Sequence, residues 1–433
     1  MADIVKQYGA LLKRTLERGN IGLARKMISA GLMEEDLRIR LHPDKRMPKA
    51  YRRLSRIAIQ STRDGFRKPE QYAWTNIFSP VEILECFGLN CVSIECVASF
   101  LSGFQIEDYC IDYAENHGIA PTLCSYHKSF IGGVDCGLVP KPQFAVTTSM
   151  ICDGNINTFR YLSRRHGIDN YIIDVPDEYS ESAVHYVTQQ LEEMIAAMED
   201  RFHKKLDLCD LRRILHRENQ SKALYQKFLQ RQRTCCFPNT LTLNMYLLFA
   251  THLQIGTPEV LRFFEKLNEE SKTWPEYTGK KAFWVHLFPY YQETLQQYFN
   301  YGQDYCIQAG DMNMDYMEPL DIQHPLEALS KKMLLNLYNG SFERKVKRIS
   351  QLVDQFDSDM VINFCHWGCK QSSGGVMLLK EEMRHKGIPM LILDGDAMDR
   401  RNSHDGQIKT RLEAFLELVG SEEDSDTEER TGA

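Results

Sequence analysis

Short runs of β-branched and aromatic residues alternate with helix-like segments in two parts of the chain, and this alternation constrains the fold more than any other feature. In the first part, candidate strands lie at residues 91–95, 144–148 and 171–175, with a helix-like segment at 158–165. A strand, a helix and another strand at this spacing indicate parallel βαβ units. The second part has candidate strands at residues 282–287, 305–307, 360–364 and 390–393.

This pattern predicts an α/β fold with two Rossmann- or flavodoxin-like parallel-sheet domains, an N-terminal helical region and connecting helices. The chain has 433 residues, and domains usually have about 150, so two or three domains are expected. Apolar residues at helical spacing predict a helix over residues 4–28, in a pattern that Gly31 ends. The predicted regions are a helical part (1–70), a first α/β domain (71–200), connecting helices (201–275), a second α/β domain (276–420) and a disordered acidic tail (421–433).

Charge is distributed unevenly along the chain, whose formal net charge is −7. Residues 1–70 contain 17 Lys and Arg against 8 Asp and Glu, whereas residues 421–433 contain 6 acidic residues and one Arg. The basic region either binds phosphate groups or an acidic partner, or it is a solvated helical face packed beside an acidic body. Nucleic acid is not expected as a partner, because no aromatic ladder or known module accompanies the basic residues.

Several common classes of protein are disfavoured. The N-terminus has neither a secretory signal nor a transit peptide, and the uncharged segment 234–258 is too polar to span a membrane. We therefore expect a cytoplasmic protein without a membrane partner, in which this segment forms a buried helix. The sequence also lacks a phosphate-binding loop, a dinucleotide fingerprint, a zinc-protease helix and a hydrolase nucleophile elbow. We do not expect it to hydrolyse ATP by itself.

Thirteen cysteines are the clearest chemical signal. Cys124 lies in a predicted loop or helix start, Cys152 follows one predicted strand, and Cys365 and Cys369 follow another. Because ligands gather at the carboxyl ends of parallel strands, these thiols are candidates to converge. Thiolates from separate loops suit an iron–sulfur cluster, whereas the paired knuckles typical of zinc are absent. Cys136 is an unassigned further candidate. The other eight are expected to be ordinary apolar residues: Cys86, Cys91, Cys96, Cys110, Cys209, Cys235, Cys236 and Cys306.

Seven motifs occur in order between residues 80 and 419: C-S-Y-H-K-S at 124–129, I-C-D-G-N at 151–155, I-D-V-P at 173–176, H-W-G-C-K at 366–370, G-I-P at 387–389, D-G-D at 394–396 with D-R at 399–400, and Gln407 with T-R-L-E-A-F at 410–415. Over this range the chain resembles the 2-hydroxyacyl-CoA dehydratases, whose relatives include benzoyl-CoA reductases and double-cubane cluster proteins.

The resemblance implies a 4Fe-4S cluster held by Cys124, Cys152 and Cys369, with the fourth iron open to water or to the thioester carbonyl of an acyl-CoA substrate. It implies two partners: a related second dehydratase subunit, and a separate ATP-hydrolysing iron–sulfur activator that supplies one electron. The expected reaction removes water from a 2-hydroxyacyl-CoA through a ketyl radical and gives an enoyl-CoA. Spacing to the 387–389 motif favours Cys369 over Cys365 as ligand.

The resemblance also suggests roles for neighbouring residues. Glu82 matches an acidic position of the family and is a candidate acid–base group for departure of the hydroxyl, or else a structural residue at a helix N-terminus. His127 is a candidate to tune the cluster or to bind substrate, or else a structural histidine. Lys370, Asp394 and Asp396 are read as supporting residues, and Arg411 as a partner of a CoA phosphate or of an acid such as Asp399.

Three alternatives remain open from the sequence. The extra cysteines leave room for a double-cubane-type reductase component, and the family also includes benzoyl-CoA-reductase-type ATP-coupled components. A third reading is a non-catalytic relative that keeps the fold as a scaffold subunit. The presence of all three matching cysteines favours the enzyme.

Overall fold

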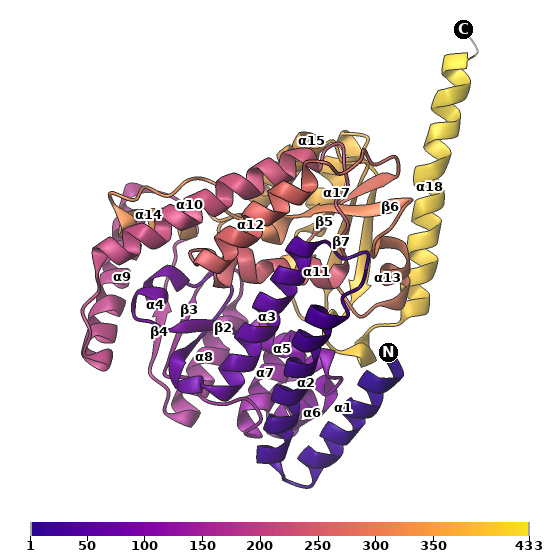
Figure 1. Cartoon of the computed structure of the whole chain (residues 1–433). Helices are drawn as coiled ribbons and strands as arrows, with labels where there is room; N and C mark the ends of the chain where they lie inside the picture. Colours follow the sequence, from indigo (N-terminus) through magenta and orange to yellow (C-terminus); the bar gives the residue numbers. More distant parts are fainter. Residues whose placement is uncertain (1, 432–433) are drawn as a thin grey trace.

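Within residues 2–431, which the computed structural model describes, the strands form two four-stranded parallel sheets (Figure 1). Side-chain environments are described for residues 4–420. The sheet orders are β2-β1-β3-β4 and β6-β5-β7-β8, so the two sheets share one topology and the predicted α/β class is confirmed. The strands are β1 (Tyr72–Thr75), β2 (Asn90–Ser93), β3 (Phe144–Thr148), β4 (Asn170–Ile173), β5 (Lys280–Val285), β6 (Tyr305–Gly310), β7 (Met360–His366) and β8 (Met390–Gly395).

Helices surround both sheets and connect them. Those of the first part are α1 (Ala2–Glu17), α2 (Ile21–Leu41), α3 (Lys49–Arg67), α4 (Val81–Cys86), α5 (Ile94–Gly103), α6 (Glu107–Asn116), α7 (Ser125–Asp135), α8 (Asp153–His166) and α9 (Glu181–Phe202). Those of the second part are α10 (Leu208–Arg231), α11 (Leu241–Leu248), α12 (Pro258–Ser271), α13 (Glu293–Phe299), α14 (Pro325–Leu334), α15 (Phe342–Phe356), α16 (Lys370–Ser373), α17 (Val376–His385) and α18 (Asp405–Thr431).

One strand was not predicted, and several boundaries differ from the prediction. The sequence pattern misses β1, which is only four residues long, although Tyr72, Trp74 and Thr75 are residue types enriched in strands. The strand predicted at 91–95 ends at Ser93, because the Ser93 hydroxyl accepts the backbone N–H of Cys96 and caps α5. The strands predicted at 171–175 and 282–287 lie two residues or fewer nearer the N-terminus, at Asn170–Ile173 and Lys280–Val285.

The single helix predicted over residues 4–28 is wrong. The chain breaks at Gly19, which has φ of +72°, and Asn20 caps α2 by accepting the N–H of Leu23. Gly31 does not end the pattern but lies inside α2, where an added Cβ would lie 2.7 Å from the Phe104 ring. Its missing side chain permits close packing instead of a turn.

Basic residues of the N-terminal helices have partners within the protein. Lys13 forms an ion pair with Asp108 of α6 at 2.5 Å, and Arg56 pairs with Asp36 at 2.8 Å. Arg25 donates to the carbonyl of Leu138 at 3.2 Å. These contacts support the reading of the basic region as a helical face packed on the body of the protein.

Within the segment 234–258, α11 and the π-helical turn at Phe249–Leu253 form a largely buried helix, as expected, whereas residues 234–240 lie outside it. No helix in the described part of the chain is long and apolar enough to cross a membrane. Cys236 and Cys306 were expected to be ordinary unpaired residues, and this expectation is wrong because they form a disulfide that joins the α10–α11 connection to β6. Their separation of 70 residues gives no sequence signal.

The predicted disordered tail, residues 421–433, falls on positions whose side chains are not described, and residues 432–433 lie outside the described residues altogether. The backbone of α18 is traced to Thr431. The predicted final helix, residues 407–418, lies within α18.

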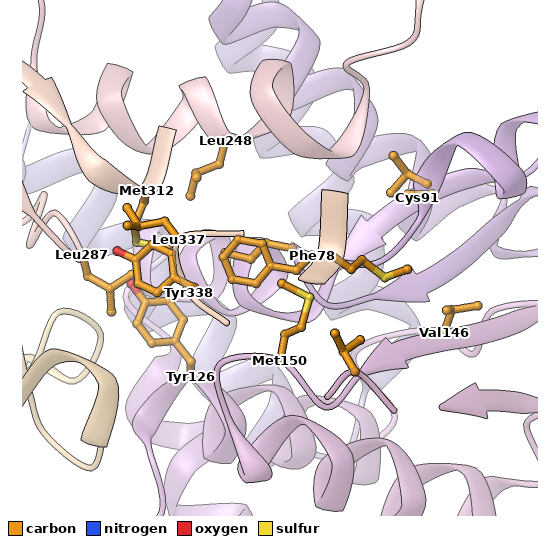
Figure 2. Packing of buried hydrophobic residues seen from close by; sticks show 14 of the residues in the cluster. Phe78, Cys91, Tyr126, Val146, Met150, Leu248, Leu287, Met312, Leu337 and Tyr338 are labelled. Atoms are coloured by element: carbon orange, nitrogen blue, oxygen red, sulfur yellow. The ribbon is translucent and has the colours of Figure 1, made fainter. Parts of the chain in front are cut away.

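A shared apolar core joins the two α/β parts (Figure 2). Phe78 from the first part stacks on Tyr338 from the second, with ring centroids 5.6 Å apart. Met150, which follows β3, and Leu248 of α11 belong to the same cluster. The ends of the strands of both sheets are therefore packed against one another, and the residues that follow those strands meet in the space between.

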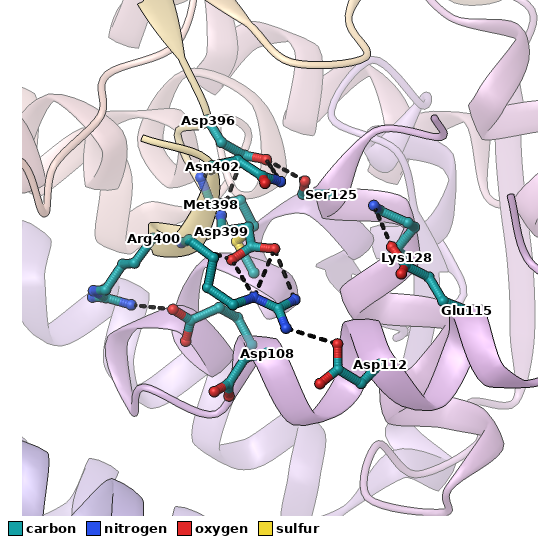
Figure 3. A network of polar contacts seen from close by, with 12 residues as sticks. Asp108, Asp112, Glu115, Ser125, Lys128, Asp396, Met398, Asp399, Arg400 and Asn402 are labelled. Atoms are coloured by element: carbon teal, nitrogen blue, oxygen red, sulfur yellow. Dashed lines mark hydrogen bonds and ion pairs between the residues drawn. The ribbon is translucent and has the colours of Figure 1, made fainter. Parts of the chain in front are cut away.

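Ion pairs complete this junction (Figure 3). Arg400 and Arg401, which follow β8, reach across to α6: Arg400 binds Glu107 at 2.6 Å and Arg401 binds Asp112 at 2.7 Å. Asp396 accepts the hydroxyl of Ser125 at the start of α7. The loop after β8 thus fixes the helix that begins beside Cys124.

Candidate functional site

The three predicted cluster cysteines lie at equivalent local positions. Cys124, Cys152 and Cys369 are the residues immediately before α7, α8 and α16. Partial positive charge at a helix N-terminus favours a thiolate. The backbone N–H of Gly154 donates to the sulfur of Cys152 at 3.2 Å, as this position requires.

All three cysteines line one cavity of about 80 Å³ between the two α/β parts. Apolar side chains, including Ile77, Leu248 and Leu287, form much of the remaining wall. The structure therefore brings together cysteines that are up to 245 positions apart in the sequence. Cys96, expected to be an ordinary apolar cysteine, also faces this cavity.

Gly368 controls the approach of the loops that carry Cys124 and Cys369. It has φ of +75°, and an added Cβ would lie 2.9 Å from the backbone nitrogen of Cys124. A side chain there would push the two loops apart.

We expect Gly368→Ala to lower the free energy of unfolding by about 1–2 kcal/mol from the left-handed backbone alone, and further through the clash. Gly387→Ala is the matched control, because Gly387 has φ of +70° but open space around its Cα. Urea denaturation of both variants measures the difference. Equal losses would show that contact with Cys124 adds nothing.

An imidazole lies at each of the three sulfurs. The Nε2 atom of His366 is 3.2 Å from the sulfur of Cys124, that of His286 is 3.6 Å from Cys369, and that of His127 is 3.8 Å from Cys152. Burial lowers the pKa of His127 to about 4, and it lowers the pKa of His286 and of His366 as well. Burial therefore favours the neutral form of all three rings.

The donor set fits an iron–sulfur cluster. Burial raises the pKa of the Cys124 thiol, and it raises the pKa of Cys152 to about 11, although backbone N–H groups at the two helix starts oppose the shift; binding of a metal would replace the proton. Among the described residues, no three His, Cys, Asp or Glu side chains are grouped closely enough for a single metal ion. In a 4Fe-4S cluster each thiolate binds a different iron, so its ligands surround a cavity and do not crowd one ion.

Cys365 and Cys136 do not belong to this cavity. The Cys365 thiol donates to the carbonyl of Ser372 at 3.3 Å behind the loop, which leaves Cys369 as the cysteine that faces the cavity. Cys136 ends α7 and donates to the carbonyl of Gly133 at 3.5 Å.

Glu82 lies in a small adjoining cavity instead. Its carboxylate binds Lys332 at 2.6 Å, and Lys332 also binds Glu218 at 2.8 Å. Burial raises the pKa of Glu82 to about 7, although Lys332 opposes the shift. Ile77 and Met150 line this second cavity, and Ile77 also lines the cysteine cavity, so the two spaces adjoin.

The sequence analysis gave no role to several residues that line the cysteine cavity: Glu95, Tyr126, Asn155, His286 and His366. Tyr126, Asn155 and His366 stand in the quoted motifs. Glu95 is the second residue of α5, which follows β2, and His286 follows β5, so polar residues at strand ends were the available signal for these two. Burial raises the pKa of Glu95 to about 7. The Tyr126 hydroxyl is buried without a hydrogen-bond partner in the described residues.

The other residues singled out from the sequence are Arg411, Asp394, Asp396 and Lys370. Arg411 forms an ion pair with Asp394 at 2.7 Å, so an ion pair was the right expectation but Asp399 was the wrong partner, since Asp399 pairs with Arg401. Asp396 lies 3.5 Å from His366. Lys370 opens α16 next to Cys369.

Comparison with known proteins gives the family. Residues 76–419 match the family described as 2-hydroxyglutaryl-CoA dehydratase, D-component. The chain belongs to this family. The matched range contains all three cysteines, and it also contains Glu82 and Glu95.

Relatives of this D-component chain are dehydratase subunits. It is 21% identical over 388 residues to the (R)-phenyllactyl-CoA dehydratase alpha subunit of Clostridium sporogenes, covering 82% of this chain and 91% of that protein. It is 23% identical over 400 residues to the (R)-2-hydroxyisocaproyl-CoA dehydratase alpha subunit of Clostridioides difficile, covering 84% and 95%. The alpha subunit of lactoyl-CoA dehydratase from Anaerotignum propionicum is 20% identical over 401 residues.

Proposed function

We propose that this chain is the iron–sulfur subunit of a 2-hydroxyacyl-CoA dehydratase, a hydro-lyase that converts a 2-hydroxyacyl-CoA into an enoyl-CoA and water. The observation that carries the proposal is the single cavity lined by Cys124, Cys152 and Cys369, each placed before a helix. These thiols would hold a 4Fe-4S cluster.

Such a cluster, when bound, supplies one electron and a Lewis-acidic iron to a thioester carbonyl. The β-proton of the thioester is too weakly acidic for a side-chain base, so its removal would depend on a substrate radical that the bound cluster makes accessible. The apolar wall of Ile77, Leu248 and Leu287 would keep water from the radical.

The proposal includes two protein partners. The relatives are alpha subunits of dehydratases, which supports a related second subunit. A separate ATP-hydrolysing activator would be the electron source, as the family resemblance implies; this sequence contains no phosphate-binding loop of its own. Eleven of the thirteen cysteines are unpaired and two form the Cys236–Cys306 disulfide. The proposal places the chain in a reducing cytoplasm, where unpaired thiols are usual and a disulfide is rare.

Anaerobic purification followed by metal analysis tests the proposal. We expect brown protein with about four irons and four sulfides per chain, and dehydration of a 2-hydroxyacyl-CoA once a second subunit, an activator, ATP and a reductant are added. Colourless, iron-free protein after reconstitution with iron and sulfide would contradict it and would favour a scaffold role.

Two carboxyl groups are candidates to protonate the departing hydroxyl. Glu82 matches an acidic position of the family and lines the smaller cavity, whereas Glu95 lines the cavity of the three cysteines. With a pKa of about 7, each is partly protonated at neutral pH. We propose Glu95 as a second candidate for the acid, in addition to Glu82, because Glu95 lines the cavity of the three cysteines.

Glutamine substitutions separate the two carboxyls. Loss of the acid is expected to lower kcat about 100-fold. The wild-type rate should fall as pH rises through about 7, because the carboxyl then loses its proton. We expect Glu95→Gln to lower kcat and to abolish this pH dependence, and measuring Glu82→Gln in the same way shows whether Glu82 is the acid instead. Unchanged kcat in both variants would exclude both carboxyls.

A further inference from the structure

Each of the three candidate cluster thiols has its own histidine, and the three histidines come from different parts of the fold. His127 belongs to α7, His286 follows β5, and His366 ends β7. Their Nε2 atoms lie 3.2–3.8 Å from the sulfurs, within the range of N–H···S hydrogen bonds. The pairs are His127 with Cys152, His286 with Cys369, and His366 with Cys124. Three separate elements supply the same contact to three separate sulfurs.

The backbone determines the tautomer of His366. The backbone N–H of Ala397 donates to its Nδ1 atom at 3.0 Å, closer than the Asp396 carboxylate oxygen at 3.5 Å, so Nδ1 is the acceptor and carries no proton. In the neutral ring the proton then lies on Nε2, which faces the sulfur of Cys124. His366 is therefore a hydrogen-bond donor to Cys124.

The other two rings are also held in place. The Nδ1 atom of His127 lies 3.0 Å from the Thr158 hydroxyl, which orients the ring with Nε2 toward Cys152. Gly154 leaves room for this approach, because an added Cβ would lie 3.0 Å from the Cys152 sulfur and 3.1 Å from the His127 Nε2 atom.

His286 adopts a backbone conformation unusual for a non-glycine residue, with φ of +72°. Its backbone N–H donates to the buried carboxylate of Asp311 at 2.8 Å, which stabilises this conformation. The hydroxyl of Tyr338 donates to the other oxygen of Asp311 at 2.8 Å, and the Tyr338 ring packs edge-on against the imidazole. The buried Nδ1 atom has no partner among the described residues, so Nε2 toward Cys369 is its one polar contact there.

We propose that His127, His286 and His366 each donate an Nε2–H hydrogen bond to a cluster thiolate and together raise the reduction potential of the cluster. The inference rests on the proposed function. Reduction adds negative charge that is shared with the sulfur ligands, so hydrogen-bond donors stabilise the reduced form more than the oxidised form. The reduced cluster then forms more readily when the activator delivers an electron.

The first test uses the full chain with its own cluster. We would label the histidine nitrogens with ¹⁵N, reduce the cluster and record electron–nuclear double resonance spectra. Hydrogen bonds to the sulfurs predict ¹⁵N couplings and an exchangeable proton coupling that disappears in D₂O. Absence of both in protein with full iron content would overturn the inference while leaving the proposed function intact, whereas failure to bind iron would overturn the proposed function itself.

The second test compares His366→Leu with His366→Gln by redox titration of the cluster. The glutamine amide can place a donor near the position of Nε2, whereas leucine cannot donate. We expect a shift to a more negative potential in the leucine variant and a smaller shift, or none, in the glutamine variant. His117→Leu is the control, because His117 is exposed on α6 and stacks on Tyr113.

Equal potentials in wild type, His366→Leu and the triple leucine variant, with iron content unchanged, would overturn the inference. If a leucine variant loses its cluster, the nitrogen couplings in the wild-type protein decide the question on their own.

Discussion

Serine at any one of Cys124, Cys152 or Cys369 is expected to abolish dehydration and to lower the iron content of the purified protein. Three protein thiolates are the smallest set that holds a cluster with one open iron, and serine oxygen is a poor substitute for sulfur at iron. Removing one ligand therefore affects cluster binding and not only the rate. We expect at least a 1,000-fold loss of activity, on the order of the transition-state stabilisation that an essential group supplies.

Matched cysteine controls make this result specific. Cys365 is four residues from Cys369 but faces away from the cavity, and Cys209 is exposed on α10. Serine at either position is expected to leave iron and sulfide content unchanged. Full iron content and activity in all three ligand variants would contradict the proposed function and favour a scaffold subunit.

Among the substitutions considered for stability, Lys332→Met is expected to lower the free energy of unfolding the most. Lys332 binds both Glu82 and Glu218, and these two carboxylates are fully buried. Glu218 keeps a second partner, since Lys222 binds it at 2.8 Å, whereas Glu82 is left without a cation. Breaking a buried ion pair on one side usually costs about 3–5 kcal/mol. Urea denaturation measures this loss.

The loss should depend on pH. Without Lys332 the pKa of Glu82 rises above its present value of about 7, further above the value in the unfolded chain. A carboxyl with a raised folded-state pKa destabilises the fold as pH rises from the unfolded toward the folded pKa. Lys332→Met should therefore be less stable at pH 8 than at pH 6, relative to wild type.

A second substitution checks the physical reason. Adding Glu82→Gln to Lys332→Met removes the unpaired charge and should restore part of the lost stability and remove the pH dependence. Lys331→Met is the neighbouring control. Equal stability of Lys332→Met and Lys331→Met would show that the buried pair contributes nothing.

Strand positions, and the positions of the candidate cysteines at strand and helix ends, followed from local patterns. Seven of the strands coincide with short β-branched runs, and the residues that follow β3 and β7 include Cys152 and Cys369, as expected for a parallel sheet. The short strand β1 lacked such a run, and its pairing with β2 and β3 comes from its place at the centre of the sheet.

The sequence by itself determined the α/β class, the two sheets, the family and the three candidate ligands, because these depend on local periodicity and on ordered motifs. Only the tertiary structure decided that Glu82 lies beside Lys332 while Glu95 faces the cysteines, that Cys236 bonds to Cys306, and that a histidine meets each candidate thiol. His286 and His366 are separated from their sulfurs by 83 and 242 positions. Such contacts arise from the packing of two sheets against each other, which no local pattern encodes.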